Sequence, residues 1–329
     1  GGDIPTINPK KRKAYVATLQ TREKNDPIQE YHKNLAATLQ DTLERAGQQM
    51  VEWLYEQTGI RHLCLAGGTA LNCSMNGILA RLSCVDDIFI QPAAHDSGTA
   101  LGAALTLFVQ KTGHRPSWQM EHAYWGPAYD NEEIEMALRG FTNIKYHLCE
   151  DIFAETAELL ARGNIVGWFQ GRLEVGPRAL GNRSILADPS HPEMKDSINH
   201  KVKHREPWRP FAPTILEESM KRYADSPIPS PYMILAFDGN SNSRTELVSA
   251  THVDGTYRPQ TVSKSTNPRY WNLIKSFERL TGIPAVLNTS FNVDGQPIVN
   301  TPHEAIDTFL NCGMDYLAIG DFLVGKEGL

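Results

Sequence analysis

Apolar residues recur at steps of three and four along residues 28–58, which is the spacing of one face of an α-helix. The pattern is carried by Tyr31, Leu35, Leu39, Leu43, Ala46, Met50 and Leu54. Gly59 follows, and a glycine at that position commonly ends a helix because it adopts left-handed backbone angles without strain. The first part of the chain therefore predicts one long amphipathic helix.

Short apolar runs alternate with helical segments in the next stretch, and each run ends in a polar turn. Gly67-Gly68 follows the first run, and His95-Asp96-Ser97-Gly98 follows the second. This alternation of helices and strands is typical of an α/β fold. The pattern predicts strands at 62–66 and 87–91, and helices at 69–82 and 99–109.

The regular pattern stops between Lys111 and Pro127, where two prolines, two glycines and scattered aromatic residues occur. Such a composition is typical of a boundary between domains. We therefore predict a first domain at 1–115, a linker at 116–128 and a second domain at 129–329.

The second domain again alternates helices with strands. Asp151 can cap its first helix, and Thr301 can cap its last helix with Glu304 as the reciprocal partner. We expect the strand at 316–319 to end the fold. The pattern predicts helices at 151–162, 193–202, 269–281 and 302–311, strands at 164–169, 211–216, 232–238 and 283–288, and a long loop at 170–184.

Composition narrows the class of protein. The formal net charge of −6 argues against a general nucleic-acid binder, because such proteins need a positive excess. No apolar run approaches the roughly 20 residues that a membrane-spanning helix needs. The five cysteines form no Cys-x-x-Cys pair, which is the usage of a reducing cytosol. We expect a cytoplasmic globular protein with neither a membrane nor a nucleic acid as its partner.

The two polar turns of the first domain are candidate ligand sites. Gly67-Gly68, with Asn72 shortly after, would let backbone N–H groups approach a phosphate, but a tight strand-to-helix turn is equally consistent with it. Asp96 could bind a cation, although the spacing alone favours a helix-capping role.

Two arginine-rich loops give the strongest signal in the second domain. Arg178 and Arg183 lie in Gly-Pro-Arg-Ala-Leu-Gly-Asn-Arg-Ser, where the glycines and proline fix the backbone. Arginines held in a rigid loop form an anion receptor, which we favour over two structural salt bridges. Lys203, Arg205 and Arg209 lie in a second loop that is stiffened by three prolines. That loop suits a small phosphorylated ligand, and a nucleic-acid patch is the alternative.

A polar stretch follows the predicted strand at 283–288. It includes Ser290 and Asn292, and such groups at the end of a strand are typical ligand contacts in α/β sheets. A plain polar turn is the alternative. Arg258 is a further candidate cation.

Taken together, these segments resemble the NodU/CmcH family of O-carbamoyltransferases. The resemblance rests on AGGTALN, HDSG, GPRALGNRS, VKHREPWRPFAP and NTSFNVDGQPIV, and it covers nearly the whole chain. It implies an α/β fold in which a partial ASKHA (actin-like) lobe precedes a YrdC-like domain with a twisted mixed sheet. The HxxxH metal motif of the family's upstream lobe is missing here, so we expect only the second lobe of the first domain.

The resemblance also implies a chemistry. ATP and carbamoyl phosphate would give carbamoyladenylate, and the carbamoyl group would then pass to an acceptor hydroxyl of a secondary metabolite or glycan. The implied cofactors are ATP and Mg²⁺, with Fe²⁺ or Mn²⁺ as options in the ASKHA-like site, and a homodimer is compatible with the family.

The roles of individual residues follow only from this resemblance. Lys203, Arg209, Arg258 and Ser290 match contacts to carbamoyl phosphate and the adenylate. Arg178, Arg183 and Asn292 match contacts to the ATP phosphates. Gly67, Gly68 and Asn72 match a nucleotide-side loop, and Asp96 matches a metal ligand.

Three alternatives stay open at this point. A threonylcarbamoyl-adenylate synthase shares the YrdC-like fold, although the attached first lobe argues for the carbamoyltransferase. An RNA-binding module would use a basic concave face, and the net negative charge counts against it. A non-catalytic fragment that binds nucleotide is the third.

Overall fold

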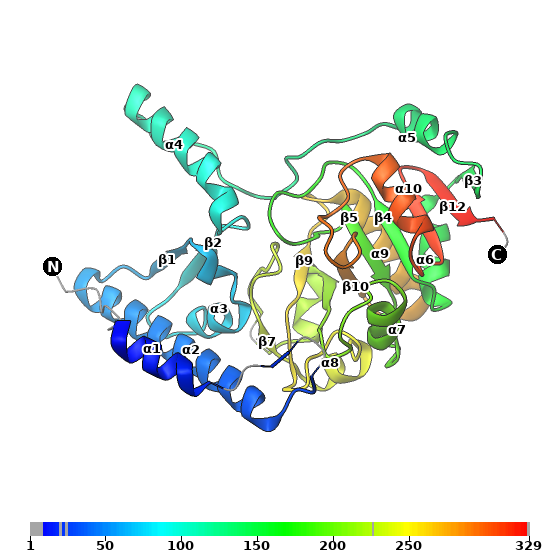
Figure 1. Cartoon of the computed structure of the whole chain (residues 1–329). Helices are drawn as coiled ribbons and strands as arrows, with labels where there is room; N and C mark the ends of the chain where they lie inside the picture. The colour runs from blue at the N-terminus through cyan, green and yellow to red at the C-terminus, as the bar shows by residue number, and fades with distance from the viewer. Residues whose placement is uncertain (1–8, 20–21, 24–25, 226, 328–329) are drawn as a thin grey trace.

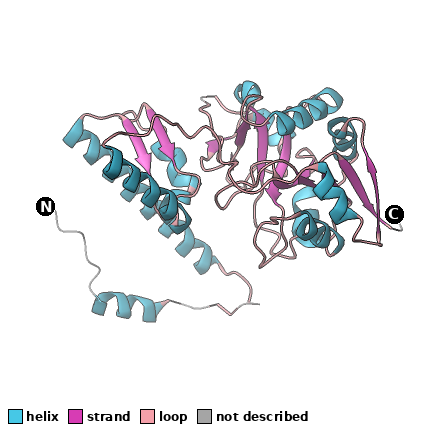
Figure 2. Cartoon of the chain, turned by 90° about the horizontal axis from the view of Figure 1, so that it is seen from above, coloured by secondary structure: helices cyan, strands magenta, loops and turns pink. Residues whose placement is uncertain are grey.

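The chain folds into two parts, which a computed structural model describes at residues 9–19, 22–23, 26–225 and 227–327. The first part holds helices α1 to α4 and a small sheet, and the second part holds the large sheet (Figure 1). Figure 2 shows the same division from above. In the described residues no helix combines the length and the apolar character that a membrane crossing needs.

The first part is built on the long helix that the apolar pattern predicts. This helix, α2, runs from Glu30 to Thr58, and Gly59 ends it in a left-handed conformation with φ 66°. Two parallel strands lie beside it, and Val51, Met75, Leu79 and Cys84 form the small core. The elements of this part are α1 (Pro9–Thr18), α2, β1 (His62–Leu65), η1 (Gly68–Leu71), α3 (Cys73–Leu79), β2 (Asp87–Ile90), η2 (Asp96–Gly98) and α4 (Thr99–Thr112).

The helix predicted at 69–82 is wrong in its extent, because two short helices replace it. Asn72 separates them, and its side chain accepts a hydrogen bond from the backbone N–H of Met75. An asparagine that caps a helix adopts non-helical backbone angles, so the helical run breaks there. Helix α4 projects away from the rest of the first part and from the second part (Figure 1), and none of its residues is buried.

The second part is a mixed eight-stranded sheet in the order β3-β12-β11-β4-β5-β10-β6-β9. The pairs β4–β11 and β6–β9 are parallel, and the others are antiparallel. Its strands are β3 (Ile144–Leu148), β4 (Val166–Phe169), β5 (Arg183–Ala187), β6 (Ala212–Leu216), β9 (Gln260–Val262), β10 (Ala285–Ser290), β11 (Tyr316–Ile319) and β12 (Phe322–Lys326), and β7 (Phe237–Asp238) pairs separately with β8 (Thr256–Tyr257).

Helices cover both faces of this sheet, so its central strands β4, β5 and β6 are buried on both sides. One apolar core joins α6 (Ile152–Ala161) and α9 (Pro268–Thr281) to one face. Another core joins α5 (Asn131–Leu138), α7 (Met194–Lys201) and α10 (Pro302–Leu310) to the other face. The remaining helices are η3 (Glu217–Arg222) and α8 (Ser241–Glu246). The α/β class with a mixed sheet is confirmed.

Several predicted boundaries in the second part are wrong. The loop at 170–184 ends early, because Arg183 and Ser184 pair with β4 and belong to β5. The strand at 232–238 shrinks to β7, since most of it packs against the first part instead. The strand at 316–319 does not end the fold, because β12 folds back beside it. The pattern also missed α5 and β3.

Two segments join the parts. The N–H of Ala236 donates to the carbonyl of Cys73 at 3.0 Å, and Asn76 donates its side-chain amide to the carbonyl of Ile234 at 2.9 Å. In the predicted linker, Ala123 accepts a hydrogen bond from the N–H of Val175 at 2.7 Å. The loop that carries Arg178 is therefore bonded to the linker.

Candidate active site

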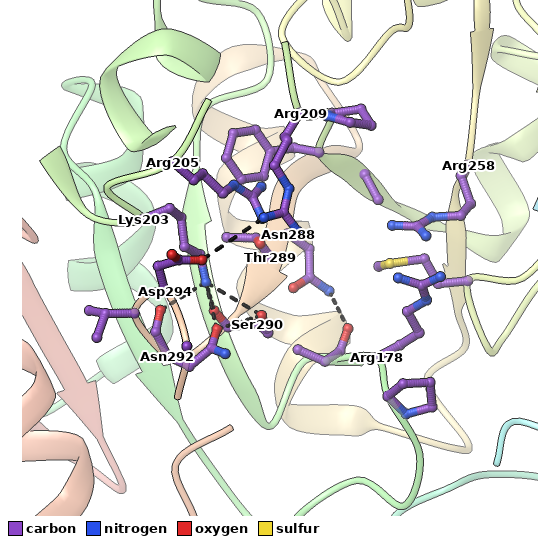
Figure 3. Close-up of a pocket in the computed structure, with 18 residues that line it drawn as sticks. Arg178, Lys203, Arg205, Arg209, Arg258, Asn288, Thr289, Ser290, Asn292 and Asp294 are labelled. Carbon is purple, nitrogen blue, oxygen red and sulfur yellow. Dashed lines mark hydrogen bonds and ion pairs between the residues drawn. The ribbon is translucent and has the colours of Figure 1, made fainter. Parts of the chain in front are cut away.

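A cavity of about 410 Å³ lies in the second part, where the end of β10 meets the segments that carry Arg178, Lys203, Met233 and Arg258 (Figure 3). It contains most of the cationic residues that the sequence singles out. The lining residues are Pro177, Arg178, Ala179, Lys203, Arg205, Arg209, Pro210, Phe211, Ala212, Met233, Arg258, Asn288, Thr289, Ser290, Asn292, Val293, Asp294 and Gly295.

Lys203 is the most enclosed of these cations, with 2% of its surface exposed. Its ammonium donates to the carbonyl oxygens of Ser290 at 2.5 Å and Asn292 at 2.9 Å. It also donates to the amide oxygen of Asn292 at 2.7 Å. Burial, followed by the charge of Arg205, lowers the pKa of Lys203 to about 7. Ser290, which ends β10, and Asn292 just after it thus form a cradle of oxygens around one amine.

Arg205 and Arg209 lie beside Lys203. Arg205 donates from Nε to the side-chain oxygen of Asn199 at 2.7 Å, and its guanidinium lies over the ring of Phe211. Burial, and then the charge of Arg209, lower the pKa of Arg205 to about 10. Arg209 is half-buried, and its nearest carboxylate oxygen, on Asp294, is 4.0 Å away. In the described part of the chain Arg205 has no ion pair with a carboxylate, and Arg209 has only this long one.

Arg178 and Arg258 form a second cationic group on the other side of the cavity, with Asn288 between the two groups (Figure 3). Burial, and then the charge of Arg258, lower the pKa of Arg178 to about 10. The Nε of Arg178 is buried and has no hydrogen-bond partner among the described residues. Burial also lowers the pKa of Arg258, while the thiol of Cys73 acts in the opposite direction.

The electrostatics of the cavity indicate an anion site. Five cationic side chains line it, and Asp294 is the one acidic residue in the lining. Like charges held close together in a partly buried site repel each other and lower one another's pKa. A bound polyanion would relieve that repulsion, and arginine can bind phosphate oxygens in pairs.

Arg183 does not line this cavity, although its motif also contains Arg178. Its guanidinium donates to the carbonyls of Gln170 at 2.6 Å and Asn182 at 3.0 Å, and stacks 3.6 Å from the centre of the Phe169 ring. It is fully buried, because it begins strand β5 and points into the fold. We therefore assign Arg183 to holding the loop and not to the ATP phosphates.

The residues predicted in the first part lie outside this cavity. Asn72 exchanges hydrogen bonds with Gln40 at 2.8 and 3.0 Å, and it caps α3. Gly67 donates its N–H to the carbonyl of Ala94, and Gly68 begins η1. The polar groups named here thus bond to α2, to α3 and to the segment after β2.

Asp96 is exposed and does not by itself make a metal site. Within the described ranges, the group of three ligand-type side chains close enough for one ion is His147, Cys149 and Glu155, near edge strand β3. Asp96 is not in that group. The described residues around Asp96 therefore do not make a complete metal centre.

Sequence reasoning missed several lining residues. The resemblance gives Arg205 no role, although it lies in the second arginine-rich loop, and it lines the cavity. Asp294 was visible in the motif Asn-Val-Asp-Gly, but nothing distinguished it from a turn residue. Met233 gave no signal at all, although it lines the cavity with a left-handed φ of 56°.

Two curated nodulation proteins align with most of this chain. The chain is 44% identical to the nodulation protein NolO of Bradyrhizobium diazoefficiens over 95% of this chain and 58% of NolO. It is also 44% identical to the nodulation protein NolNO of Sinorhizobium fredii over 95% of this chain and 47% of NolNO. The chain thus spans about half the length of these curated relatives.

Among solved structures, HypF of T. kodakarensis overlaps 56% of this chain and 23% of HypF, with 18% identity and a TM-score of 0.38. Sua5 of P. abyssi overlaps 53% of this chain and 47% of Sua5, with 14% identity and a TM-score of 0.37. Overlaps at these scores support no assignment.

Two family models match the sequence directly. The Carbamoyltransferase N-terminus matches residues 8–105, and the Carbamoyltransferase C-terminus matches residues 157–326, which contain all the cavity residues. With this match over both parts, the chain belongs to the carbamoyltransferase family.

Proposed function

We propose that the cavity binds ATP and carbamoyl phosphate and forms carbamoyladenylate, whose carbamoyl group then passes to an acceptor hydroxyl. The observation that carries the proposal is a cavity with five cations and one carboxylate, in a chain of the carbamoyltransferase family. Two polyanions must approach each other, and their repulsion has to be cancelled before any bond forms. Cationic side chains that already point into the cavity offset this repulsion without having to reorganise when the substrates bind.

The proposed steps balance as follows. Water releases phosphate from carbamoyl phosphate and leaves carbamate. A carbamate oxygen attacks the α-phosphorus of ATP, the bond to the β-phosphate breaks, and pyrophosphate leaves. The acceptor oxygen then attacks the carbamoyl carbon, AMP leaves, and the hydroxyl proton passes to solvent. An acceptor on a glycan or secondary metabolite rests on the sequence resemblance alone.

The two cationic groups suggest a division of labour. Lys203 and Arg209, with Ser290, would face the carbamoyl phosphate. Arg178 would face the ATP phosphates, and Arg258 lies close enough to it to serve the junction where the adenylate forms. Asn292 is better suited to hold Lys203 than to bind phosphate, because its amide oxygen accepts from that amine.

ATP would enter as its Mg²⁺ complex, in which the ion neutralises part of the phosphate charge. Within the cavity Asp294 is the one carboxylate that could contact such an ion. The five free cysteines and the use of ATP support a cytoplasmic location as part of the same proposal.

The test is to mix the chain with ATP, Mg²⁺ and carbamoyl phosphate. We expect mass spectrometry to detect carbamoyladenylate, and pyrophosphate release to depend on carbamoyl phosphate. Arg258→Ala should slow that release by roughly 30- to 1000-fold, because one cation at the reacting phosphates is worth about 2–4 kcal/mol. Arg162→Ala is the matched control, since Arg162 is an exposed arginine paired with Glu158.

Two results would contradict the proposal. A folded sample that binds ATP but releases no pyrophosphate with carbamoyl phosphate would show that the cavity does not activate this donor. Release that requires L-threonine and bicarbonate instead would indicate a threonylcarbamoyl-adenylate synthase.

A further inference from the structure

Glu174 is a buried carboxylate next to the cavity that does not line it. Only 4% of its surface is exposed, and it precedes the Arg178 loop in the chain. Its Oε1 accepts hydrogen bonds from the backbone N–H groups of Leu180 at 2.7 Å, Asn182 at 2.8 Å and Arg183 at 3.1 Å. Bonds from N–H groups to a carboxylate are among the stronger ones in proteins. One oxygen atom thus accepts hydrogen bonds from three backbone N–H groups that follow Arg178 in the chain.

The other polar groups of this turn are also paired. The carbonyl of Leu180 accepts from the hydroxyl of Tyr124 and from the side chain of Gln260, both at 2.8 Å. The N–H of Gly181 donates to the hydroxyl of Ser184 at 3.0 Å. Gly181 has φ 97°, and a side chain there would overlap the ring of Tyr270. The turn therefore has one fixed shape, organised around the Glu174 carboxylate.

Arg178 contrasts with this turn. Its guanidinium lines the cavity, and its Nε is buried without a hydrogen-bond partner in the described part of the chain. Among the described residues no hydrogen bond of its side chain fixes its direction, so its direction depends on the backbone that carries it. That backbone is held on its C-terminal side by Glu174 and by Asn288, which donates to the carbonyl of Ala179 at 3.2 Å.

We propose that Glu174 is a positioning residue that presets Arg178 for a phosphate group of the substrate. The identity of that substrate as ATP rests on the proposed function, whereas the positioning itself does not. Preset cations bind an anion without the cost of ordering a loop, so the loss of Glu174 should appear as weaker binding through Arg178. The Oε2 of Glu174 has no partner among the described residues, so a glutamine can keep the Oε1 bonds.

The experiment is a double-mutant cycle read by calorimetry, with inorganic pyrophosphate as the probe. Glu174→Ala should weaken pyrophosphate binding about 10-fold in the wild-type background. It should weaken binding less than about 2-fold in the Arg178→Ala background, because the residue through which it acts is then gone. Glu174→Gln should recover most of the affinity. Glu158→Ala is the matched control, since it removes an exposed glutamate far along α6.

Hydrogen exchange provides a measurement that does not depend on any substrate. Glu174→Ala should speed exchange at the amides of Leu180, Asn182 and Arg183, while the amides of the α9 helix stay protected. Equal weakening of binding in both backgrounds would overturn the positioning role. Unchanged exchange at these three amides would overturn it as well, even if the wild-type chain binds no pyrophosphate and the proposed function fails.

Discussion

Lys203→Arg tests whether the cavity takes up a proton when an anion binds. In the free cavity, burial and then the charge of Arg205 lower the pKa of Lys203 to about 7. The oxygens of Ser290 and Asn292 around its amine act in the opposite direction, because they stabilise the ammonium form. An anion beside the amine should raise the pKa, and binding should then be coupled to proton uptake.

The size of the effect follows from that pKa. About half of the Lys203 side chains are neutral at pH 7, and about nine-tenths are neutral at pH 8. Sulfate is a suitable probe because it keeps its charge across this range. If bound sulfate raises the pKa of Lys203 to about 9 or higher, uptake should rise from roughly 0.1 proton at pH 6 to roughly 0.8–0.9 at pH 8. Affinity should fall by up to about 10-fold per pH unit above pH 7.

The assay is titration calorimetry in buffers that differ in ionisation enthalpy, at pH 6, 7 and 8. The dependence of the observed heat on that enthalpy gives the number of protons taken up. In Lys203→Arg uptake should vanish, because a guanidinium stays charged throughout this range. Uptake near zero in the wild type at pH 8 would refute the reasoning, because it would mean that the oxygens around Lys203 keep it protonated. Uptake that persists in Lys203→Arg would place the titrating group elsewhere.

Three further outcomes are expected. Arg209→Lys keeps the charge but loses the planar pair of donors, so kcat/KM for carbamoyl phosphate should fall roughly 10- to 100-fold. This corresponds to a loss of about 1.4–2.7 kcal/mol of transition-state stabilisation. Arg162→Lys should leave kcat/KM unchanged in the same assay. Arg183→Met leaves buried carbonyls without a donor, so urea unfolding should show that the free energy of unfolding falls by roughly 2–4 kcal/mol. A weaker pyrophosphate affinity at unchanged stability would contradict the assignment of Arg183 to holding the loop. Gly181→Ala should lower the free energy of unfolding, measured in urea, by roughly 2–4 kcal/mol, because the added Cβ would lie 1.9 Å from the Tyr270 ring. Gly163→Ala, with φ 83° and open space around it, should cost only about 1 kcal/mol, and equal losses at both glycines would argue against the overlap.

Residue types and local spacing predicted the cationic loops well, because the glycines and prolines that stiffen them are adjacent in sequence. They did not separate Arg178 from Arg183. Which of the two faces the cavity depends on where β5 begins and on its pairing with β4, and both are set by contacts distant in sequence. The apolar pattern could not give this register, since a strand buried on both faces shows no alternation.

The oxygens around Lys203 could not be predicted from local sequence either, because they are also distant along the chain. The Lys203 amine meets oxygens that lie 87 and 89 residues further along the chain. The family resemblance implies that Lys203, Ser290 and Asn292 contribute to one site, whereas residue spacing alone gives only separate candidates. The segment at 232–238 misled the pattern because its apolar residues lie in a core that joins the two parts, and within this described segment only Phe237 and Asp238 pair with a strand.

The segment around Met233 makes the two parts of the chain mechanically dependent on each other. Met233 lines the anion cavity, while the carbonyl of the next residue, Ile234, is bonded to Asn76 in the first part. A Cβ on Gly176 would come within 2.9 Å of the Pro92 carbonyl, so the Arg178 loop also contacts the first part. A shift of the first part would therefore move both Met233 and the Arg178 loop. The spacing between the cations of the cavity is therefore a property of how the two parts are seated.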